Sequence, residues 1–487
     1  MSDTAPAKER KWICLLACLA ALRVFIFSAA FPFFNNVDEQ PNFDLVVKYS
    51  RLDIPNDLDL YSPESIHDIV LYQSYAFMGQ RTNTPPWRLP SDQIQELLKQ
   101  TKGWQTVKNY ECSQPPLYYA LAGGWRRLGL AIGLQGEASL YWLRFLNIGL
   151  AVALVLLAYR TARSLFPEND FIAYGVPAVL ACFPQSIFFA VDNDTLSALT
   201  FGLAFFWLIR FLNSTTPSAR TGIALGLSLA AAHLTKMTNL PLLVVAITAI
   251  TFKVHRLEQQ KQLRSTGMAL LALMVCAALP IGFWTEWCLV HFGDPTGSEI
   301  KAQHFGWVHK PFLEWWHHPI FTPTGFWTFL SQLLGSFWQG EFFWHGRSMA
   351  SAVIDDCYAI ASIIALMYAA ILVLKRKAVA DPTGALRVSL ACVAGAIAFW
   401  GLLSTTYLFG DFFYPSDTLP YFLSGRLILG ALIPFLLLFV YALDRAMGKA
   451  GRRTKFIALS VLCLAMLTVE LLTNLPAFSN PYNWFHL

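Results

Sequence analysis

Charged residues are scarce in this sequence. Asp, Glu, Lys and Arg make up 14% of its 487 residues, against roughly 25% in an average soluble domain. The apolar residues instead form repeated blocks of about 18 residues or more, which is long enough to cross a lipid bilayer. This composition excludes an ordinary soluble fold and predicts an all-α polytopic membrane protein.

Paired-cysteine motifs of the CxxC kind are missing as well. Seven of the nine cysteines lie in apolar blocks or at their edges, while Cys112 and Cys357 stand alone. This pattern excludes a disulfide framework and a zinc site. The net charge of +5 does not indicate nucleic acid as a partner. The basic residues gather at the ends of apolar blocks, where they set the orientation of a membrane protein.

The basic connections allow the chain to be threaded through the membrane. They alternate with connections that contain almost no Lys or Arg, and all of them are placed inside. The threading predicts about eleven transmembrane helices, with the N-terminus inside and the C-terminus outside. It requires the segment 115–134 to lie along the membrane surface as an interfacial helix. The expected spans are 12–34, 138–159, 171–190, 195–212, 221–236, 239–254, 266–290, 351–374, 386–410, 423–443 and 456–474.

The first apolar block follows Lys8, Arg10 and Lys11, so a cleaved signal peptide is an alternative to a retained helix. The block is longer than the roughly 7 to 15 apolar residues of a signal peptide, which favours a retained first helix. The threading then divides the chain into residues 1–34 with the first helix, an external loop 35–137, helices 2–7 in 138–290, an external loop 291–350, and helices 8–11 with a short external C-terminus in 351–487.

The second external loop is rich in aromatic residues. Residues 291–350 hold six of the ten histidines and six of the sixteen tryptophans. An aromatic belt at the membrane interface explains tryptophans but not the histidines. Aromatic faces with polar neighbours also suit a pocket for a carbohydrate or a lipid head group. His304 and Trp344 are therefore candidate substrate-binding residues.

Carboxylates and cations gather on the outer side of this threading. Together they describe a site that handles a phosphate group and a proton. They are Asp38 and Glu39 in "VDEQPNFD", Glu111 and Gln114 in "ECSQPPLYY", Asp192 and Asp194 in "VDNDTLSAL", Lys236 in "HLTKMTNL" and Arg426 in "SGRLILGAL".

Each group also has an ordinary structural interpretation. Asp192 and Asp194 could cap the helix that starts nearby, because an aspartate accepts hydrogen bonds from free N–H groups at a helix start. Lys236 and Arg426 could extend to the interface as membrane anchors. The first acidic pair could be the solvated start of a loop.

The motifs, in this order along most of the chain, resemble the GT-C superfamily of integral membrane glycosyltransferases, which take a sugar from a polyprenyl-phosphate carrier. The likeness is greatest to the branch of protein mannosyltransferases, aminoarabinose transferases and their bacterial relatives. It also includes the aromatic "SFWQGEFFW". Relatives often carry His or Tyr where this chain has Asn42.

The resemblance implies an enzyme in which Asp38 takes the proton of an acceptor hydroxyl and Glu39 assists. Cations would stabilise the charge of the leaving phosphate. A divalent metal ion is left open, with Asp38 and Glu111 as its ligands, and no other cofactor is implied. The donor phosphate would bind Lys236, Arg426 and Arg347, and substrates would contact Glu111, Gln114, Asp192, Asp194, His304 and Trp344.

A carboxylate with a reference pKa of about 4 is a weak base at neutral pH. The resemblance therefore implies late proton transfer and apolar neighbours that raise the pKa of Asp38. Displacement by one base, with no enzyme nucleophile, predicts inversion at the anomeric carbon. The acceptor would be a glycan, a lipid or a protein. The compact loops indicate a bacterial inner membrane with the site on the periplasmic side.

A transporter or flippase of a lipid-linked glycan is the alternative, since charged residues line membrane cavities there too. The polar residues gather at one face rather than the midplane, and no clear internal repeat is visible, which both favour the transferase. A non-catalytic assembly subunit would not need the carboxylates.

Overall fold

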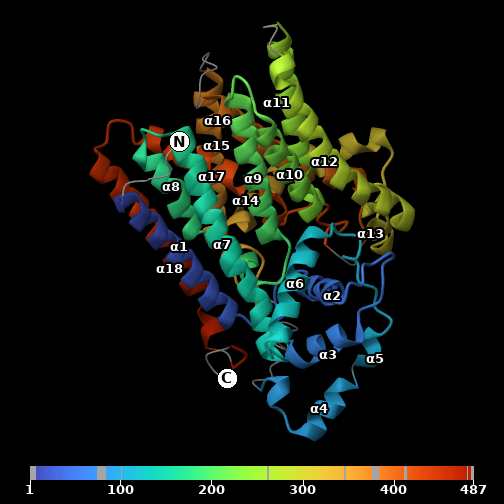
Figure 1. Cartoon of the computed structure of the whole chain (residues 1–487). Coiled ribbons are helices and arrows are strands. Elements are labelled where there is room, and N and C mark those ends of the chain that lie inside the picture. The colour runs from blue at the N-terminus through green and yellow to red at the C-terminus, as the bar shows by residue number, and fades with distance from the viewer. Residues whose placement is uncertain are drawn as a thin grey trace.

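The computed structural model describes residues 7–73, 84–99, 101–259, 263–344, 347–375, 383–410, 414–479 and 481–483. Long helices dominate the described residues (Figure 1). Two short antiparallel ribbons accompany them. One pairs β1 (Val308–His309) with β4 (Tyr407–Leu408), and the other pairs β2 (Phe343–Trp344) with β3 (Arg347–Ser348). The prediction of an all-α polytopic membrane protein is confirmed.

Within the described residues, nine helices are long and apolar enough to cross a membrane. Their length follows from uninterrupted apolar sequence, because at 1.5 Å per residue about 20 residues span the hydrocarbon layer. They are α1 (Ala7–Ala30), α7 (Glu137–Leu165), α9 (Asp194–Asn213), α11 (Leu240–Gln259), α12 (Leu263–Phe292), α15 (Ala352–Lys375), α16 (Thr383–Thr406), α17 (Leu432–Ala446) with the 3-10 turn η6 (Gly425–Ala431) before it, and α18 (Arg452–Phe478).

Two of the eleven expected spans are helices that are shorter than a bilayer. Helix α8 (Asp170–Ala181) has 12 residues and contains Pro177, and α10 (Ala219–Thr235) has 17 residues. At 1.5 Å per residue both fall short of the roughly 30 Å of hydrocarbon. The count of eleven and the orientation of the chain stay predictions, as does the division of the chain into five parts.

Helix α17 lies at the centre of the bundle. Its leucines are buried on all sides because α8, α9, α15 and α16 surround it. Helices α10 and α12 pack much closer together than side chains normally allow. A Cβ on Gly222 would lie 2.1 Å from the carbonyl oxygen of Ala269, so only glycine permits this approach. Small residues at such contacts are typical of membrane helices.

A layer of short helices covers one end of the bundle (Figure 1). Helix α6 joins the layer to α7, since the indole of Trp125 stacks on Trp142 at 4.1 Å and each ring N–H donates to the other's carbonyl oxygen. The expected helix within 115–134 is therefore present as α6. The layer consists of α2 (Glu39–Ser50), α3 (Pro63–Tyr72), α4 (Ser91–Leu98), α5 (Thr101–Trp104) and α6 (Leu117–Ala131).

The second long segment contributes helices α13 (Ser298–His304) and α14 (Pro323–Gln339). Helix α14 packs against α15 and against the turn η6. The candidate site lies where the layer of short helices meets the ends of α9, α10 and η6.

Candidate functional site

The tight turn after α1 places Asp38. Helix α1 ends before Pro32, and the chain then reverses into α2 with positive φ angles at Phe34 (61°) and Asp38 (60°). Left-handed backbone is uncommon outside glycine and is tolerated best by Asn and Asp. Asp38 is the residue before α2 but its side chain does not cap that helix. The carboxylate is left free to point elsewhere.

Glu39 fixes this turn. Its carboxylate accepts from Nε and Nη2 of Arg144, both at 2.8 Å, and from the backbone N–H groups of Phe34 at 2.8 Å and Val191 at 3.1 Å. Arg144 in turn donates to the carbonyl oxygens of Phe31 (2.5 Å) and Pro32 (2.8 Å). The glutamate and the arginine are buried, and the four bonds fill the acceptor positions of the carboxylate.

This geometry gives Glu39 a structural role, and the catalytic role expected of it stays a prediction. A carboxylate that holds a bidentate arginine and two backbone N–H groups is a structural anion. Arg144 belongs to none of the motifs that predict the site. Its position inside an expected membrane span was a usable signal, since ionisable residues there usually have a specific partner.

Asp38 lies between Tyr110 and Arg426. The hydroxyl of Tyr110 donates to Oδ1 at 2.6 Å, and Nη2 of Arg426 contacts Oδ2. Burial would raise the pKa of Asp38, but the charges of Arg426 and Lys301 and these two hydrogen bonds lower it to about 2. The expectation of a raised pKa is wrong for this arrangement, because a cation outweighs the apolar surroundings.

Arg426 also contacts the acidic pair at the start of α9. Its Nη1 lies 3.2 Å from Oδ2 of Asp192 and 3.4 Å from Oδ2 of Asp194. The ammonium of Lys236 lies 2.5 Å from Oδ1 of Asp194. Both cations therefore face the acidic pair, and the alternative that they are interfacial anchors is wrong.

Capping explains only one of the two aspartates. Oδ1 of Asp192 accepts from the backbone N–H of Asp194 at 2.8 Å, whereas the Asp194 side chain caps nothing and pairs with the cations. Burial, followed by the charge of Asp194, raises the pKa of Asp192 well above its ordinary value. Three carboxylates and two cations thus meet in this site.

Asn42 connects α2 with this cluster. Its Nδ2 donates to Oδ2 of Asp192 at 3.0 Å and to the carbonyl oxygen of Asp38 at 2.8 Å, and its Oδ1 accepts from the hydroxyl of Tyr119 at 2.5 Å. The position that is often His or Tyr in GT-C relatives is therefore a buried hydrogen-bonding bridge here.

Glu111 and His304 border the site. Lys301 pairs with Glu111 at 2.5 Å and lies over the ring of Tyr110 at 5.1 Å. His304 is exposed, and its ring lies 6.4 Å from that of Tyr110. Oε1 of Gln114 is buried without a protein partner in the described part of the chain. The structure therefore brings the predicted residues Glu111, Gln114 and His304 into the neighbourhood of Tyr110.

Two predicted residues cannot be placed. The side chains of Trp344 and Arg347 lie outside the described part of the structure, although their backbone forms the ribbon of β2 and β3. Their assignment to substrate and donor phosphate stays a prediction.

The aromatic motif "SFW" positions the arginine. It lies in α14, where Oγ of Ser336 accepts from the backbone N–H of Gly425 at 2.8 Å. A Cβ on Gly425 would lie 1.9 Å from the backbone nitrogen of Phe337. Only glycine permits this approach, which fixes Arg426 beside the acidic pair.

Several buried polar atoms, on two residues shortly before Asp38 in the sequence and on its partner Arg426, have no protein partner among the described residues. They are both amide atoms of Asn35, Nδ2 of Asn36 and Nε of Arg426. Asn35 is fully buried and Asn36 is 4% exposed. Buried polar groups in proteins are nearly always hydrogen-bonded, so these atoms point to a ligand or to water at this place.

A divalent metal ion does not fit the proposed ligands. Asp38 already pairs with Arg426, and Glu111 with Lys301. The described residues also contain no group of three or more His, Cys, Asp or Glu that could hold a metal ion. Each of the two predicted metal ligands is thus already paired with a cation.

Comparison with known proteins gives one family and several structures. The family model described as "Predicted membrane protein (DUF2142)" matches residues 22–410. No curated protein matches the chain. The oligosaccharyltransferase of Archaeoglobus fulgidus, in complex with Zn and sulfate, is 14% identical with a TM-score of 0.46, covering 95% of this chain and 53% of that chain.

Two further structures are similar at the same level. The archaeal oligosaccharyltransferase AglB from Archaeoglobus fulgidus, with an inhibitory peptide and a dolichol-phosphate, is 14% identical with a TM-score of 0.48, covering 98% of this chain and 57% of that chain. ArnT from Cupriavidus metallidurans bound to undecaprenyl phosphate is 11% identical with a TM-score of 0.37, covering 90% of this chain and 79% of that chain.

This chain spans about half the length of the archaeal structures that it matches. With identities of 11–14% and TM-scores below 0.5, these structures do not assign an activity to this chain, and its function is argued from its own residues.

Proposed function

The chain belongs to the family of predicted membrane proteins DUF2142, and we propose that it is an inverting glycosyltransferase. It would move a sugar from a polyprenyl-phosphate carrier to an acceptor hydroxyl at the outer face of the membrane. The proposal includes a bacterial inner membrane, with the site on the periplasmic side.

The observation that supports this proposal best is the contact of Arg426 with three carboxylates. Asp38 follows the first membrane helix, Asp192 and Asp194 begin α9, and Arg426 lies hundreds of residues further along. A candidate base and a candidate phosphate-binding cation therefore meet at one end of the bundle. A polyprenyl carrier cannot leave the bilayer, so its phosphate must be met at such an end.

In the proposed reaction, the acceptor oxygen forms a bond to the anomeric carbon while the bond from that carbon to the phosphate oxygen breaks. The proton of the acceptor hydroxyl passes to Asp38, and the leaving polyprenyl phosphate keeps the electron pair. Arg426 and Lys236 stabilise the charge that develops on the phosphate. One displacement without a covalent enzyme intermediate inverts the anomeric carbon.

Arg426 also offers a way to activate the base. In the described arrangement this arginine holds Asp38, whose lowered pKa makes it a weak proton acceptor. A donor phosphate that engages Arg426 weakens this ion pair. Burial, the largest single influence on the pKa of Asp38, then raises it with less opposition from Arg426. Donor binding would thus prepare Asp38 for the acceptor, which predicts that the donor binds first.

Neutral polar groups of the two segments that contain Asp38 and Glu111 suit the transferred sugar. Asn35, Asn36 and Gln114 each present a buried polar atom without a protein partner in the described residues. Sugar hydroxyls donate and accept hydrogen bonds and would satisfy these atoms. Specificity for one sugar would come from this group, since a site built to hydrogen-bond a hydroxyl rejects ligands that lack it.

The test compares wild type with Asp38→Asn in lipid nanodiscs, with a panel of labelled polyprenyl-phosphate monosaccharides. Asparagine keeps the shape of the side chain but cannot take the proton. Loss of a general base typically lowers the rate about 10²- to 10⁴-fold. We expect wild type to consume one donor and Asp38→Asn to lose that turnover, while Asp53→Asn, at an exposed aspartate of the same segment, keeps it.

Donor binding without turnover, equal in wild type and Asp38→Asn, would contradict the proposal. That result would favour the transporter of lipid-linked glycans, which needs the cations but no base.

A further inference from the structure

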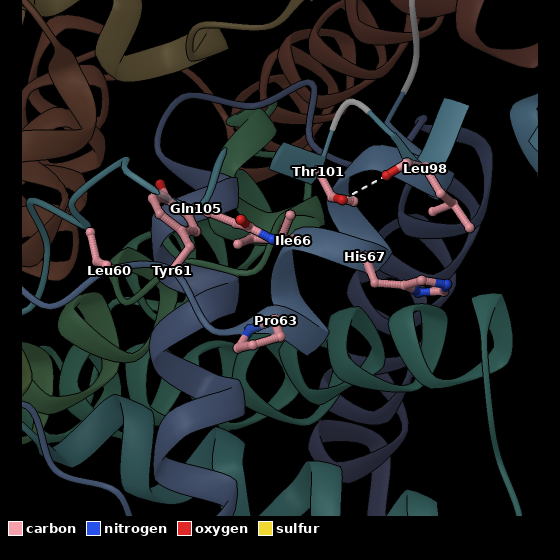
Figure 2. A pocket seen from close by; sticks show the side chains of 8 residues that line it. All are labelled: Leu60, Tyr61, Pro63, Ile66, His67, Leu98, Thr101 and Gln105. Carbon is pink, nitrogen blue, oxygen red and sulfur yellow. Dashed lines mark hydrogen bonds between the residues drawn. The ribbon is translucent and has the colours of Figure 1, made fainter. Parts of the chain in front are cut away.

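A cavity of about 570 Å³ lies in the layer of short helices, apart from the site around Asp38. Its eight lining side chains come from α3, from the segment before α3, and from the region of α4 and α5. In the view of Figure 2, Ile66 lies between Tyr61 on one side and His67 on the other. The volume is in the range of pockets that bind small ligands.

The wall of this cavity belongs to the same hydrogen-bonded framework as Asp38. Leu60 forms an antiparallel bridge with Lys108, and the backbone N–H of Tyr61 donates to the carbonyl oxygen of Val107 at 3.3 Å. Three residues after Val107, the hydroxyl of Tyr110 holds Asp38 at 2.6 Å. A ligand seated in the cavity is therefore positioned by the same backbone that positions the candidate base.

Tyr61 lines the cavity and is also near the acidic residues. Burial raises the pKa of its hydroxyl, and the charges of Asp44, Asp38 and Glu111 raise it further. Its side chain is 6% exposed and belongs to the lining of the cavity. One tyrosine is thus common to the cavity and to the surroundings of the acidic residues.

The lining of the cavity is uncharged apart from one histidine. None of the eight side chains is Lys, Arg, Asp or Glu, and His67 pairs with Asp68 at 3.1 Å. Tyr61 and Ile66 give an apolar floor, while Thr101 and Gln105 supply uncharged hydrogen-bonding groups. A phosphate or a charged peptide would find no counter-charge among these side chains. A sugar ring has an apolar C–H face and neutral hydroxyls, and it matches both parts of the lining.

We propose that this cavity is an acceptor subsite that binds a neutral sugar unit, so that the acceptor is a glycan. This inference rests on the proposed transferase function, because it assigns the bound sugar to the acceptor side of that reaction. A sugar unit in the cavity would hold the acceptor chain with its reactive hydroxyl toward Asp38.

The first experiment measures binding and needs no turnover. The full chain in nanodiscs is titrated with maltotriose and with triacetylchitotriose, two neutral sugars, and binding is followed by calorimetry. Leu60→Trp places a larger side chain at the rim, where Leu60 is 47% exposed, and Leu52→Trp makes the same change at a leucine that is 76% exposed and does not line the cavity. We expect Leu60→Trp to weaken binding about tenfold or more, as filling a pocket does, and Leu52→Trp to leave binding unchanged.

A second pair of variants guards against misfolding. Gln105→Ala removes a hydrogen-bonding group from the lining, and Gln93→Ala makes the same change at an exposed glutamine of α4 that does not line this cavity. Both positions are exposed, so neither variant disturbs a core. Weaker sugar binding in Gln105→Ala alone is the expected result.

Two results would overturn the inference. One is equal binding by Leu60→Trp and Leu52→Trp, and the other is no binding of either sugar by wild type at millimolar concentration. The two proposals fail separately. Sugar binding that Leu60→Trp weakens, without any donor turnover by wild type, would retain the subsite and reject the transferase. Donor turnover by wild type without sugar binding would retain the transferase and reject the subsite.

Discussion

Asp38 and Glu39 are neighbours in the sequence with opposite environments. Asp38 is partly exposed and meets groups that a substrate could displace, namely a tyrosine hydroxyl and an arginine. Glu39 is 1% exposed and its acceptor positions are filled by Arg144 and two backbone N–H groups. One carboxylate is therefore available for chemistry, and the other holds the turn that orients it.

This difference predicts that two nearly isosteric substitutions change the free energy of unfolding by different amounts. Glu39→Gln leaves the buried Arg144 without a counter-charge, and breaking a buried ion pair costs about 3 to 5 kcal/mol. Asp38→Asn removes one of the three carboxylates that Arg426 contacts and leaves Asp192 and Asp194 in place, so we expect a smaller loss of stability than for Glu39→Gln. The measurement is the free energy of unfolding of both variants and wild type in the same detergent.

A stable Glu39→Gln that has lost activity would contradict the structural role. It would restore Glu39 as a catalytic residue, as the sequence first indicated.

Much of the candidate site could be predicted from the sequence, because its charged residues interrupt long apolar runs. Asp38, Asp192, Asp194, Lys236 and Arg426 were found in this way, and the structure brings all of them together. Their partners could not be predicted from the sequence.

Tyr110 binds Asp38 and Asn42 binds Asp192. The amino-acid sequence around these two residues does not distinguish them from ordinary core residues. Only the approach of distant segments decides which carboxylate meets which cation. That approach also lowers the pKa of Asp38.

At the scale of elements, helix α14 and the turn η6 act as one support for the arginine. The carbonyl oxygens of Ser336 and Phe337 accept from Nε2 of Gln185, at 3.0 and 2.9 Å. The hydroxyl of Ser336 accepts from Gly425. Two motifs of the sequence, "SFW" and "SGR", are thus parts of one contact. Their common spatial role could not be read from the chain, where 89 positions separate the serine from the glycine.

Gly425→Ala tests this support. The added Cβ would lie 1.9 Å from a backbone nitrogen of α14, so the turn must move and carry Arg426 away from the acidic pair. Overpacking of this kind costs about 1 to 3 kcal/mol. We expect a lower unfolding temperature together with weaker binding of a polyprenyl-phosphate donor. Gly451→Ala is the control, because no atom lies within 4 Å of the place that its added Cβ would take. Unchanged donor binding in Gly425→Ala would show that the contact does not position the arginine.

At the scale of the whole molecule, the two ends of the helix bundle carry different groups of charges. The candidate site occupies one end. The other end holds Asp170, which pairs with Arg163 at 3.1 Å and with Arg452 at 2.6 Å. Basic connections at this second end are those that the sequence places inside. The two ends of the bundle therefore differ in their charged residues, and this difference underlies the predicted orientation in the membrane.

The positions of the short helices α8 and α10 relative to these two ends show whether their segments extend across the bundle. Helix α8 starts at Asp170, and the chain reaches the candidate site at Asp192 after a short irregular stretch and the 3-10 turn η2 (Ser186–Phe189). Helix α10 starts just after Ser214, whose carbonyl oxygen accepts from Lys253 at 2.5 Å, and it ends at Lys236 in the site. Both segments thus run from one end of the bundle to the other. Their helices are too short to be recognised as spans by length alone.

Eleven crossings therefore require that residues near α8 and α10 change sides as the long helices do, which labelling can test. Single cysteines are placed at four exposed positions, Lys99, Glu168, Arg220 and Arg256, in a chain whose exposed Cys14, Cys18 and Cys357 are replaced by serine. A membrane-impermeant maleimide added to intact cells should label only Lys99→Cys, because the other three positions follow crossings that return the chain to the inner side. Permeabilised cells should label all four. Labelling of Arg220→Cys in intact cells would contradict a crossing by the segment of α8, and labelling of Arg256→Cys would contradict a crossing by the segment of α10, because each position would then follow one crossing fewer. Glu168→Cys follows only the crossings by α1 and α7 and is the control for the inner side.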